Sequence, residues 1–73
     1  MSTTTYGVDG MTCAHCVASV TEEIGLIPGA ENVSVDLVNG GTSRVTVTSA
    51  VALDRSLVAA AVEEAGYQLV AAA

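Results

Sequence analysis

The chain has 73 residues, which is enough for one domain over residues 1–73 but leaves a small interior to bury. Val, Leu, Ile and Ala have to build the core, because the sequence contains no Phe, no Trp and two Tyr. Eight acidic residues against two arginines give a formal net charge of -6, which excludes nucleic acid as an expected partner. The charge favours a protein partner that presents basic groups, or it serves to keep a small domain in solution.

We expect neither a targeting signal nor a membrane-spanning segment in this chain. Residues 1–5 are polar and uncharged, unlike the basic and then apolar start of a secretory signal. The longest run rich in apolar residues, 57–62, is too short to cross a bilayer. These features predict a cytoplasmic protein without membrane insertion, in which cysteine thiols stay reduced.

The N-terminal third of the sequence predicts a strand, a loop and a helix. Residues 5–9 begin with a β-branched residue and alternate in character, which favours a short strand that ends at Gly10. Thr12 is the expected N-cap of the helix, and Gly25 is expected to end it. Over residues 14–24 the apolar side chains recur at three- and four-residue steps, as in an amphipathic helix: Cys16, Val17, Val20 and Ile24.

The middle of the chain predicts an antiparallel β-hairpin. Residues 39–41, Asn-Gly-Gly, tolerate positive φ angles and favour a tight turn. Apolar and polar residues alternate over residues 30–38 before this turn and over residues 42–48 after it, as in half-buried strands. The apolar members of the two strands are Val33, Val35, Leu37, Val45 and Val47.

The C-terminal third predicts a second helix and a last strand. Asp54 is the expected N-cap and Gly66 the expected end of the helix. Its apolar stripe is expected to be Leu57, Val58, Ala61, Val62 and Ala65. Residues 67–70 favour a short strand, and the alanines at 71–73 are expected to fray. The order βαββαβ matches the α+β ferredoxin-like arrangement, with two helices on one face of a four-stranded antiparallel sheet.

Both cysteines and the single histidine of the chain lie within residues 10–16, GMTCAHC. Cys13 falls in the loop after the first strand and Cys16 in the first turn of the helix, so both sulfurs can face one point. A helix N-terminus carries partial positive charge, which lowers the pKa of a cysteine and favours the thiolate. Two thiolates with few other donors suit Cu(I), which prefers sulfur and accepts low coordination numbers.

The residues beside the two cysteines have predicted roles of their own. Met11 is expected to fill the core below the loop rather than to act as a third ligand. Thr12 is neutral, whereas an acidic residue at this position would offer a hard oxygen donor that favours zinc. His15 is expected to point outwards, either as a free side chain or with a role in tuning the thiolates or in metal uptake at a shared dimer site.

A single CxxC pair also fits other functions. A thiol-disulfide oxidoreductase would carry the motif on a thioredoxin scaffold, which needs more parallel strand content than this chain can hold. A closed structural zinc site usually has four ligands, and Cys13, Cys16 and His15 supply three. Inert core cysteines are a further alternative, against which the polar loop around Cys13 argues.

The chain resembles the heavy-metal-associated domain family, and within it the small bacterial copper chaperones of the CopZ type. The resemblance rests on residues 10–16 (GMTCAHC) and 64–67 (EAGY) and on the Pro-Gly turn at 28–29, and it runs from Tyr6 to Val70. It implies a ferredoxin-like fold, Cu(I) bound by Cys13 and Cys16, and no catalytic residue. It further implies delivery of copper by ligand exchange to a copper-exporting P-type ATPase.

The resemblance also places Tyr67 beside the metal, where bacterial members have a tyrosine and eukaryotic chaperones a lysine. A tyrosine shields the negative bis-thiolate copper unit or offers it a weak O–H, and it also closes the end of the sheet. The eukaryotic chaperones are often basic and dock on acidic domains, and this polarity does not transfer to an acidic chain.

Several points stay open at the level of sequence. The chain is either a free-standing chaperone, which the start at Met1 and the lack of a trailing linker favour, or the N-terminal domain of a copper ATPase. Transport of Zn, Cd or Hg is a third alternative. A copper-bridged homodimer and copper delivery to a copper-responsive repressor are both compatible with an exposed bis-thiolate site.

Overall fold

Strand β1 (Ser2–Asp9) lies inside a four-stranded antiparallel sheet and has a partner on each side. In the computed structural model, which describes residues 1–70, β1 pairs along its whole length with β3 (Thr42–Ser49) and at its last three residues with β4 (Gln68–Val70). The strand begins before residue 5, where the sequence predicted its start, because the threonines at 3–5 join the ladder opposite β3. Such β-branched residues favour the extended conformation.

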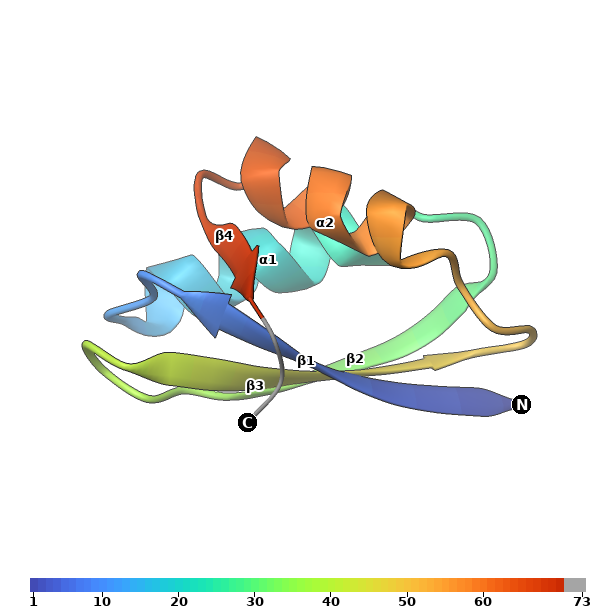
Figure 1. The fold of residues 1–73 in the computed structure, drawn as a ribbon, viewed down its shortest axis with the longest axis horizontal. Coiled ribbons are helices and arrows are strands. Elements are labelled where there is room, and N and C mark those ends of the chain that lie inside the picture. Colours follow the sequence, from blue (N-terminus) through green and yellow to red (C-terminus); the bar gives the residue numbers. More distant parts are fainter. Residues whose placement is uncertain (71–73) are drawn as a thin grey trace.

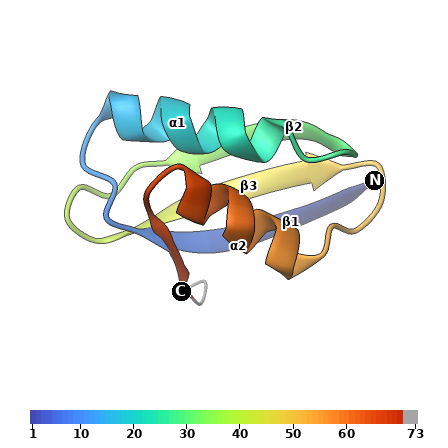
Figure 2. The ribbon, with the colours of Figure 1, turned by 90° about the horizontal axis from the view of Figure 1, so that it is seen from above.

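The helices α1 (Ala14–Gly25) and α2 (Arg55–Glu64) lie together on one face of the sheet (Figure 1). Strand β2 (Ala30–Asp36) pairs with β3, which gives the strand order β2-β3-β1-β4. Seen from the helix side, α1 runs along the β2 side of the sheet and α2 crosses over β1 (Figure 2). The predicted ferredoxin-like α+β fold is confirmed, and the alanines at 71–73 lie outside the described residues.

Small aliphatic side chains fill the layer between the sheet and the helices. Alternate residues of β1 and β3 face this layer, as the period of two along a strand requires. The two helices contribute residues at three- and four-residue steps. The buried apolar residues are Tyr6, Val8, Met11, Cys16, Val20, Ile24, Ile27, Val45, Val47, Val58, Ala61 and Val62.

Two of the predicted elements differ from the structure in detail. Leu57, predicted in the buried stripe of α2, is exposed, since it lies about 100° around the helix from Val58 and outside the face that packs on the sheet. Strand β2 ends at Asp36 rather than at residue 38, so Leu37 and Val38 belong to the turn and are exposed. The turn itself forms as predicted, with Gly40 at a φ of +76°.

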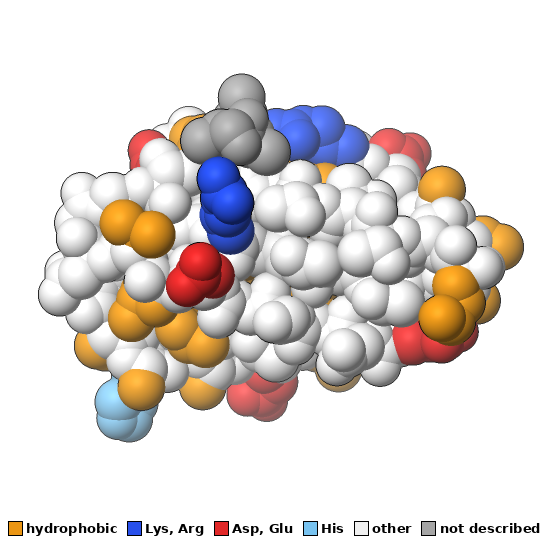
Figure 3. Space-filling view, turned by 90° about the horizontal axis from the view of Figure 1, so that it is seen from below, with side chains coloured by type: hydrophobic (Ala, Val, Ile, Leu, Met, Phe, Trp, Pro, Cys, Tyr) orange, Lys and Arg blue, Asp and Glu red, His pale blue; other side chains and the backbone are white. Residues whose placement is uncertain are grey.

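The face of the sheet opposite the helices is polar. Figure 3 shows this face with few charged side chains along its middle and hydrophobic side chains gathered toward the two ends of the molecule. Hydroxyl groups of neighbouring strands meet on it, for example Thr5 and Thr46 with oxygens 3.4 Å apart. Within residues 1–70, neither helix has the length and apolar character needed to cross a membrane.

Candidate metal site

The two cysteine sulfurs lie side by side where β1 passes into α1. Cys13 is the N-cap residue of α1 with an extended backbone (φ -156°, ψ 175°), and Cys16 lies in the first turn of the helix. The Sγ atoms are 3.5 Å apart, which is too far for a disulfide at about 2.05 Å. Two metal–sulfur bonds of about 2.3 Å each can span such a gap.

The two sulfurs differ in exposure. The side chain of Cys13 is exposed, whereas Cys16 is buried and belongs to the core cluster. The helix accounts for this difference, because Cys16 lies at four-residue spacing before the buried Val20 and Ile24, whereas Cys13 precedes the helix and its carbonyl accepts from the N–H groups of Cys16 and Val17 at 3.1 and 3.3 Å. One sulfur is therefore anchored, and the other faces any molecule that approaches the loop.

The loop that leads to the cysteines is held by its first two residues. Gly10 has a φ of +95°, a conformation that side chains disfavour, and a Cβ atom at this position would lie 3.4 Å from Cδ1 of Tyr67. Met11 follows with no exposed surface and packs in the core below the loop. The positive φ and the close approach of Tyr67 make Gly10 part of the site. The glycine in the motif was the available signal for this role, which the sequence analysis missed.

The pKa of the Cys16 thiol falls from the usual 9.0 to about 6. The main cause is a hydrogen bond from the backbone of Thr12, followed by one from the side chain of Tyr67, and these outweigh the opposing effect of burial. Cys13 adds a smaller contribution from its side chain and backbone. The same contact raises the pKa of Tyr67, since a neighbouring thiolate favours the protonated phenol. At neutral pH, Cys16 is thus a thiolate in the metal-free protein.

The prediction of Thr12 as the N-cap of α1 is wrong. Cys13 occupies the N-cap position, and no side chain makes a capping hydrogen bond there. The hydroxyl of Thr12 instead lies 3.9 Å from the Sγ atom of Cys16. The helix starts one residue later than the Thr12 cap required, because the extended backbone of Cys13 still belongs to the loop.

The other predicted site residues have different positions. His15 is exposed on the first turn of α1, as predicted. Within residues 1–70, no set of three His, Cys, Asp or Glu side chains is placed to hold one metal ion. His15 therefore does not join the two cysteines in a three-ligand site in this conformation.

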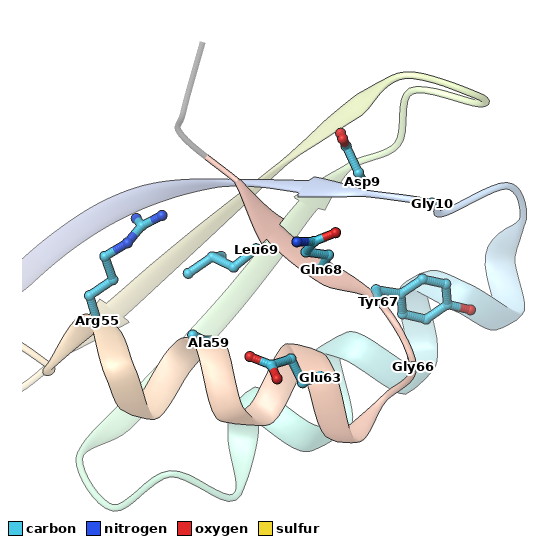
Figure 4. A pocket seen from close by; sticks show the side chains of 9 residues that line it. All are labelled: Asp9, Gly10, Arg55, Ala59, Glu63, Gly66, Tyr67, Gln68 and Leu69. Atoms are coloured by element: carbon cyan, nitrogen blue, oxygen red, sulfur yellow. The ribbon is translucent and has the colours of Figure 1, made fainter.

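The ring of Tyr67 lies between the cysteine loop and a groove. The groove lies between α2 and β4, and Figure 4 shows Tyr67 at one end of it, with the phenol oxygen pointing away from the other side chains that line it. These residues are Asp9, Gly10, Arg55, Ala59, Glu63, Gly66, Tyr67, Gln68 and Leu69. The ring thus separates the cysteine loop from a groove that carries both signs of charge.

A pair of adjacent cysteine sulfurs, one of them a thiolate and the other exposed, can bind a soft metal ion or take part in thiol exchange. Comparison with known proteins distinguishes these possibilities at the level of family. The model of the heavy-metal-associated domain matches residues 5–68. A copper-transporting ATPase 1 of Rhizobium meliloti is 40% identical over 64 residues, which are 88% of this chain and 7% of the ATPase.

Two further relatives have the size of this chain. The copper chaperone CopZ of Staphylococcus aureus is 36% identical over 70 residues, covering 96% of this chain and 100% of the chaperone. A solved structure described as CopZ metallochaperone superposes with a TM-score of 0.82 at 31% identity, covering 94% of this chain and 100% of that one. By the extent of the match and the shared fold, the chain belongs to the heavy-metal-associated domain family.

Proposed function

We propose that this chain binds Cu(I) through the sulfurs of Cys13 and Cys16 and passes it to the metal-binding domain of a copper-transporting P-type ATPase in the cytoplasm. The observation that carries the proposal is the pair of sulfur atoms 3.5 Å apart, one buried and one exposed. The relatives named as copper chaperones and copper-transporting ATPases support copper as the cargo.

The donor set favours a soft monovalent ion. Thiolates prefer Cu(I), and a hard oxygen ligand would be needed to favour zinc or a harder ion. Within residues 1–70, no further His, Asp or Glu is placed to complete a four-ligand site with the two sulfurs. Thr12, whose hydroxyl lies 3.9 Å from the Sγ atom of Cys16, is uncharged, so it offers no carboxylate oxygen to a metal ion held by the two sulfurs.

The difference in exposure suggests how the ion is exchanged. An incoming thiolate of the partner adds to copper on the open side, beside the exposed Cys13. The copper–sulfur bond to Cys13 then breaks, and the Cys13 sulfur takes up the proton that the partner's thiol lost on becoming the incoming thiolate. Cys16, anchored in the core, holds the ion until a second partner sulfur replaces it. A new bond forms before an old one breaks, so tight binding and fast transfer are compatible.

A competition titration tests the proposal. The protein is titrated against a chromophoric Cu(I) chelator under reducing conditions, together with the double variant Cys13→Ser, Cys16→Ser. We expect the double variant to lose more than about 100-fold in affinity, beyond the loss that substitutions next to a metal ligand cause. Wild-type affinity in the double variant would contradict the proposal.

Native mass spectrometry of the copper-loaded protein then gives the metal, its stoichiometry and any copper-bridged homodimer. A smaller population of the dimer in the variant His15→Ala would show that the exposed His15 contributes to it. Loading with Zn(II), Cd(II) or Hg(II) in the same experiment tests the alternative cargoes. Turnover of a model disulfide without tight Cu(I) binding would instead favour a thiol-disulfide oxidoreductase.

The same site also fits the N-terminal metal-binding domain of a copper ATPase, which the 40% identity to the Rhizobium meliloti enzyme favours. In that case the chain receives copper rather than delivers it. The mass of the endogenous polypeptide, detected with an antibody to this domain, decides between the two. Copper delivery to a copper-responsive repressor is tested by the same transfer assay with the repressor as acceptor.

A further inference from the structure

The turn between β2 and β3 exposes two large apolar side chains at the end of the molecule that holds the cysteine loop. Leu37 is 36% exposed and Val38 is 44% exposed. Both ribbon views place this turn and the β1–α1 loop at the same end (Figures 1 and 2). Figure 3 shows hydrophobic side chains gathered at that end, on the left of the view.

The turn is held in one conformation by a buried serine. Ser43 has no exposed surface, and its Oγ atom accepts a hydrogen bond of 2.8 Å from the N–H of Val38 and lies 3.4 Å from the Val38 carbonyl, to which it donates. The N–H of Gly41 also donates to this carbonyl, at 3.1 Å. A Cβ atom at Gly41 would lie 2.9 Å from Cγ1 of Val38, so only glycine leaves the valine in place. A preordered turn loses little conformational entropy when a partner covers it.

The turn is also tied to the cysteine loop. The hydroxyl of Thr42, the first residue after the turn, donates a hydrogen bond of 2.7 Å to Oδ1 of Asp9. Asp9 ends β1 and directly precedes Gly10, where the cysteine loop begins. A molecule that docks on the turn is therefore held at a fixed position relative to the two sulfurs.

Acidic side chains outnumber basic ones around this end. Asp9 and Glu63 line the groove that Tyr67 and Gly10 also border, with Arg55 as the basic residue in its lining, and Glu64 follows on the last turn of α2. Asp36 ends β2 and is opposite Arg44 in the ladder, which is the basic residue nearest to it in the sheet. The apolar turn thus lies within a mainly negative surface, in a chain of net charge -6.

We propose that Leu37 and Val38, the turn residues, form the apolar contact through which this chain docks on the domain that exchanges copper with it. The partner then presents an apolar spot beside its own thiols, surrounded by Lys or Arg, because such charges complement the acidic surface. A second copy of the chain is disfavoured as the occupant, since its acidic residues would face the same residues across a two-fold axis. This inference rests on the proposed exchange of Cu(I).

The test separates docking from metal binding. The variant Leu37→Ser, Val38→Ser is loaded with Cu(I), and the rate of transfer to the isolated metal-binding domain of the copper-transporting ATPase from the same organism is measured. We expect the rate to fall about tenfold, as for loss of an interface contact of moderate strength, while the Cu(I) affinity in chelator competition is unchanged. The matched control Leu26→Ser, Val51→Ser removes side chains that are 72% and 67% exposed outside this turn, and it should transfer at the wild-type rate.

The charge requirement has its own measurement. The wild-type transfer rate should decrease as salt is added, and Glu63→Lys, Glu64→Lys should decrease it further at low salt. A wild-type rate in the Leu37→Ser, Val38→Ser variant overturns the inference while leaving the proposed function intact. A parallel loss of Cu(I) affinity in that variant also overturns it, as does a transfer rate that rises with salt. Absence of Cu(I) binding by the wild-type protein overturns both proposals.

Discussion

Helix α2 begins with a capping hydrogen bond, in which Oδ1 of Asp54 accepts from the N–H of Ser56 at 3.2 Å. Helix α1 begins at Cys13, whose side chain makes no such bond. Both helix starts carry partial positive charge and backbone N–H groups without partners in the helix. At α2 a carboxylate accepts from one of these groups, whereas at α1 the N-cap residue is a cysteine whose side chain accepts from none.

The positions of the two cysteines are those of a capping box, with Cys13 at the N-cap and Cys16 three residues later. In a capping box, the later side chain accepts from the backbone N–H of the N-cap residue. The backbone of Thr12 lowers the pKa of Cys16 most, and the backbone of Cys13, the N-cap residue, adds a smaller contribution of the capping-box kind. The comparison teaches that α1 has, in place of a side-chain cap, a cysteine in the thiolate form, which is the form that a soft metal ion prefers.

The largest expected effect of this difference is on the pH dependence of stability. The pKa of Cys16 is about 6 in the folded protein, against the usual 9.0 of a cysteine in an unfolded chain, so between these values the unfolded chain holds a proton that the folded protein has lost. Its contribution to stability is fully present above pH 9, decreases below it, and is lost as the pH falls through about 6. In urea unfolding of the metal-free, reduced protein, the free energy of unfolding should therefore increase from pH 6 to pH 9, and this increase should be absent in Cys16→Ser.

Tyr67 provides a control for the origin of that pH dependence. Tyr67→Phe removes a hydrogen bond to the thiolate, so the pKa of Cys16 should rise and the pH dependence should weaken without disappearing. Tyr6→Phe changes the other tyrosine, which is buried in the core, and should leave the pKa of Cys16 unchanged. Thiolate absorbance during a pH titration measures the pKa directly. Identical titrations of wild type and Tyr67→Phe would exclude Tyr67 as a donor.

A smaller effect is expected at the capped helix. Asp54→Ala removes the acceptor of the Ser56 N–H and should lower the free energy of unfolding by about 1 kcal/mol. In a domain of this size the loss corresponds to about 4–8 °C in Tm. The Cu(I) affinity should not change, because α2 begins at the end of the molecule opposite the β1–α1 loop that carries the cysteines (Figure 1). Reduced affinity in this variant would show that the two helix starts are not independent.

The sequence predicted the element order, the turns and the cap of α2, because each depends on residues close in the chain. Asp54 and Gly66 are examples, since a carboxylate at an N-cap and a glycine at positive φ act locally. Exposure of Leu57 was not predictable in this way, because it depends on the angle at which α2 crosses the sheet. Thr12 and Cys13 both precede the apolar periodicity of α1, so the sequence pattern alone does not decide which of them is the N-cap, and the structure assigns Cys13.

The candidate site was predictable in its residue types but not in its asymmetry. The motif placed both cysteines at a strand–helix junction, and the structure agrees. The burial of one sulfur, the approach of Tyr67 to Gly10 and the link from Thr42 to Asp9 all join segments distant in the sequence. Such contacts follow from the sheet order, which periodicity within single elements does not specify.

The smallest expected effect exchanges the sulfur at the N-cap for a better cap. Cys13 has the extended backbone of an N-cap residue, and serine at this position accepts from the helix N–H groups. Cys13→Ser should therefore raise the free energy of unfolding of the metal-free protein by about 0.5 kcal/mol. Urea unfolding under reducing conditions measures it, with Asp54→Ser as the matched change at α2, where serine replaces an equally good cap and no gain is expected. A lower free energy of unfolding in Cys13→Ser would mean that the exposed sulfur itself stabilises the fold. The two helix starts would then differ in chemistry, but the cysteine at α1 would not lower the stability of the protein.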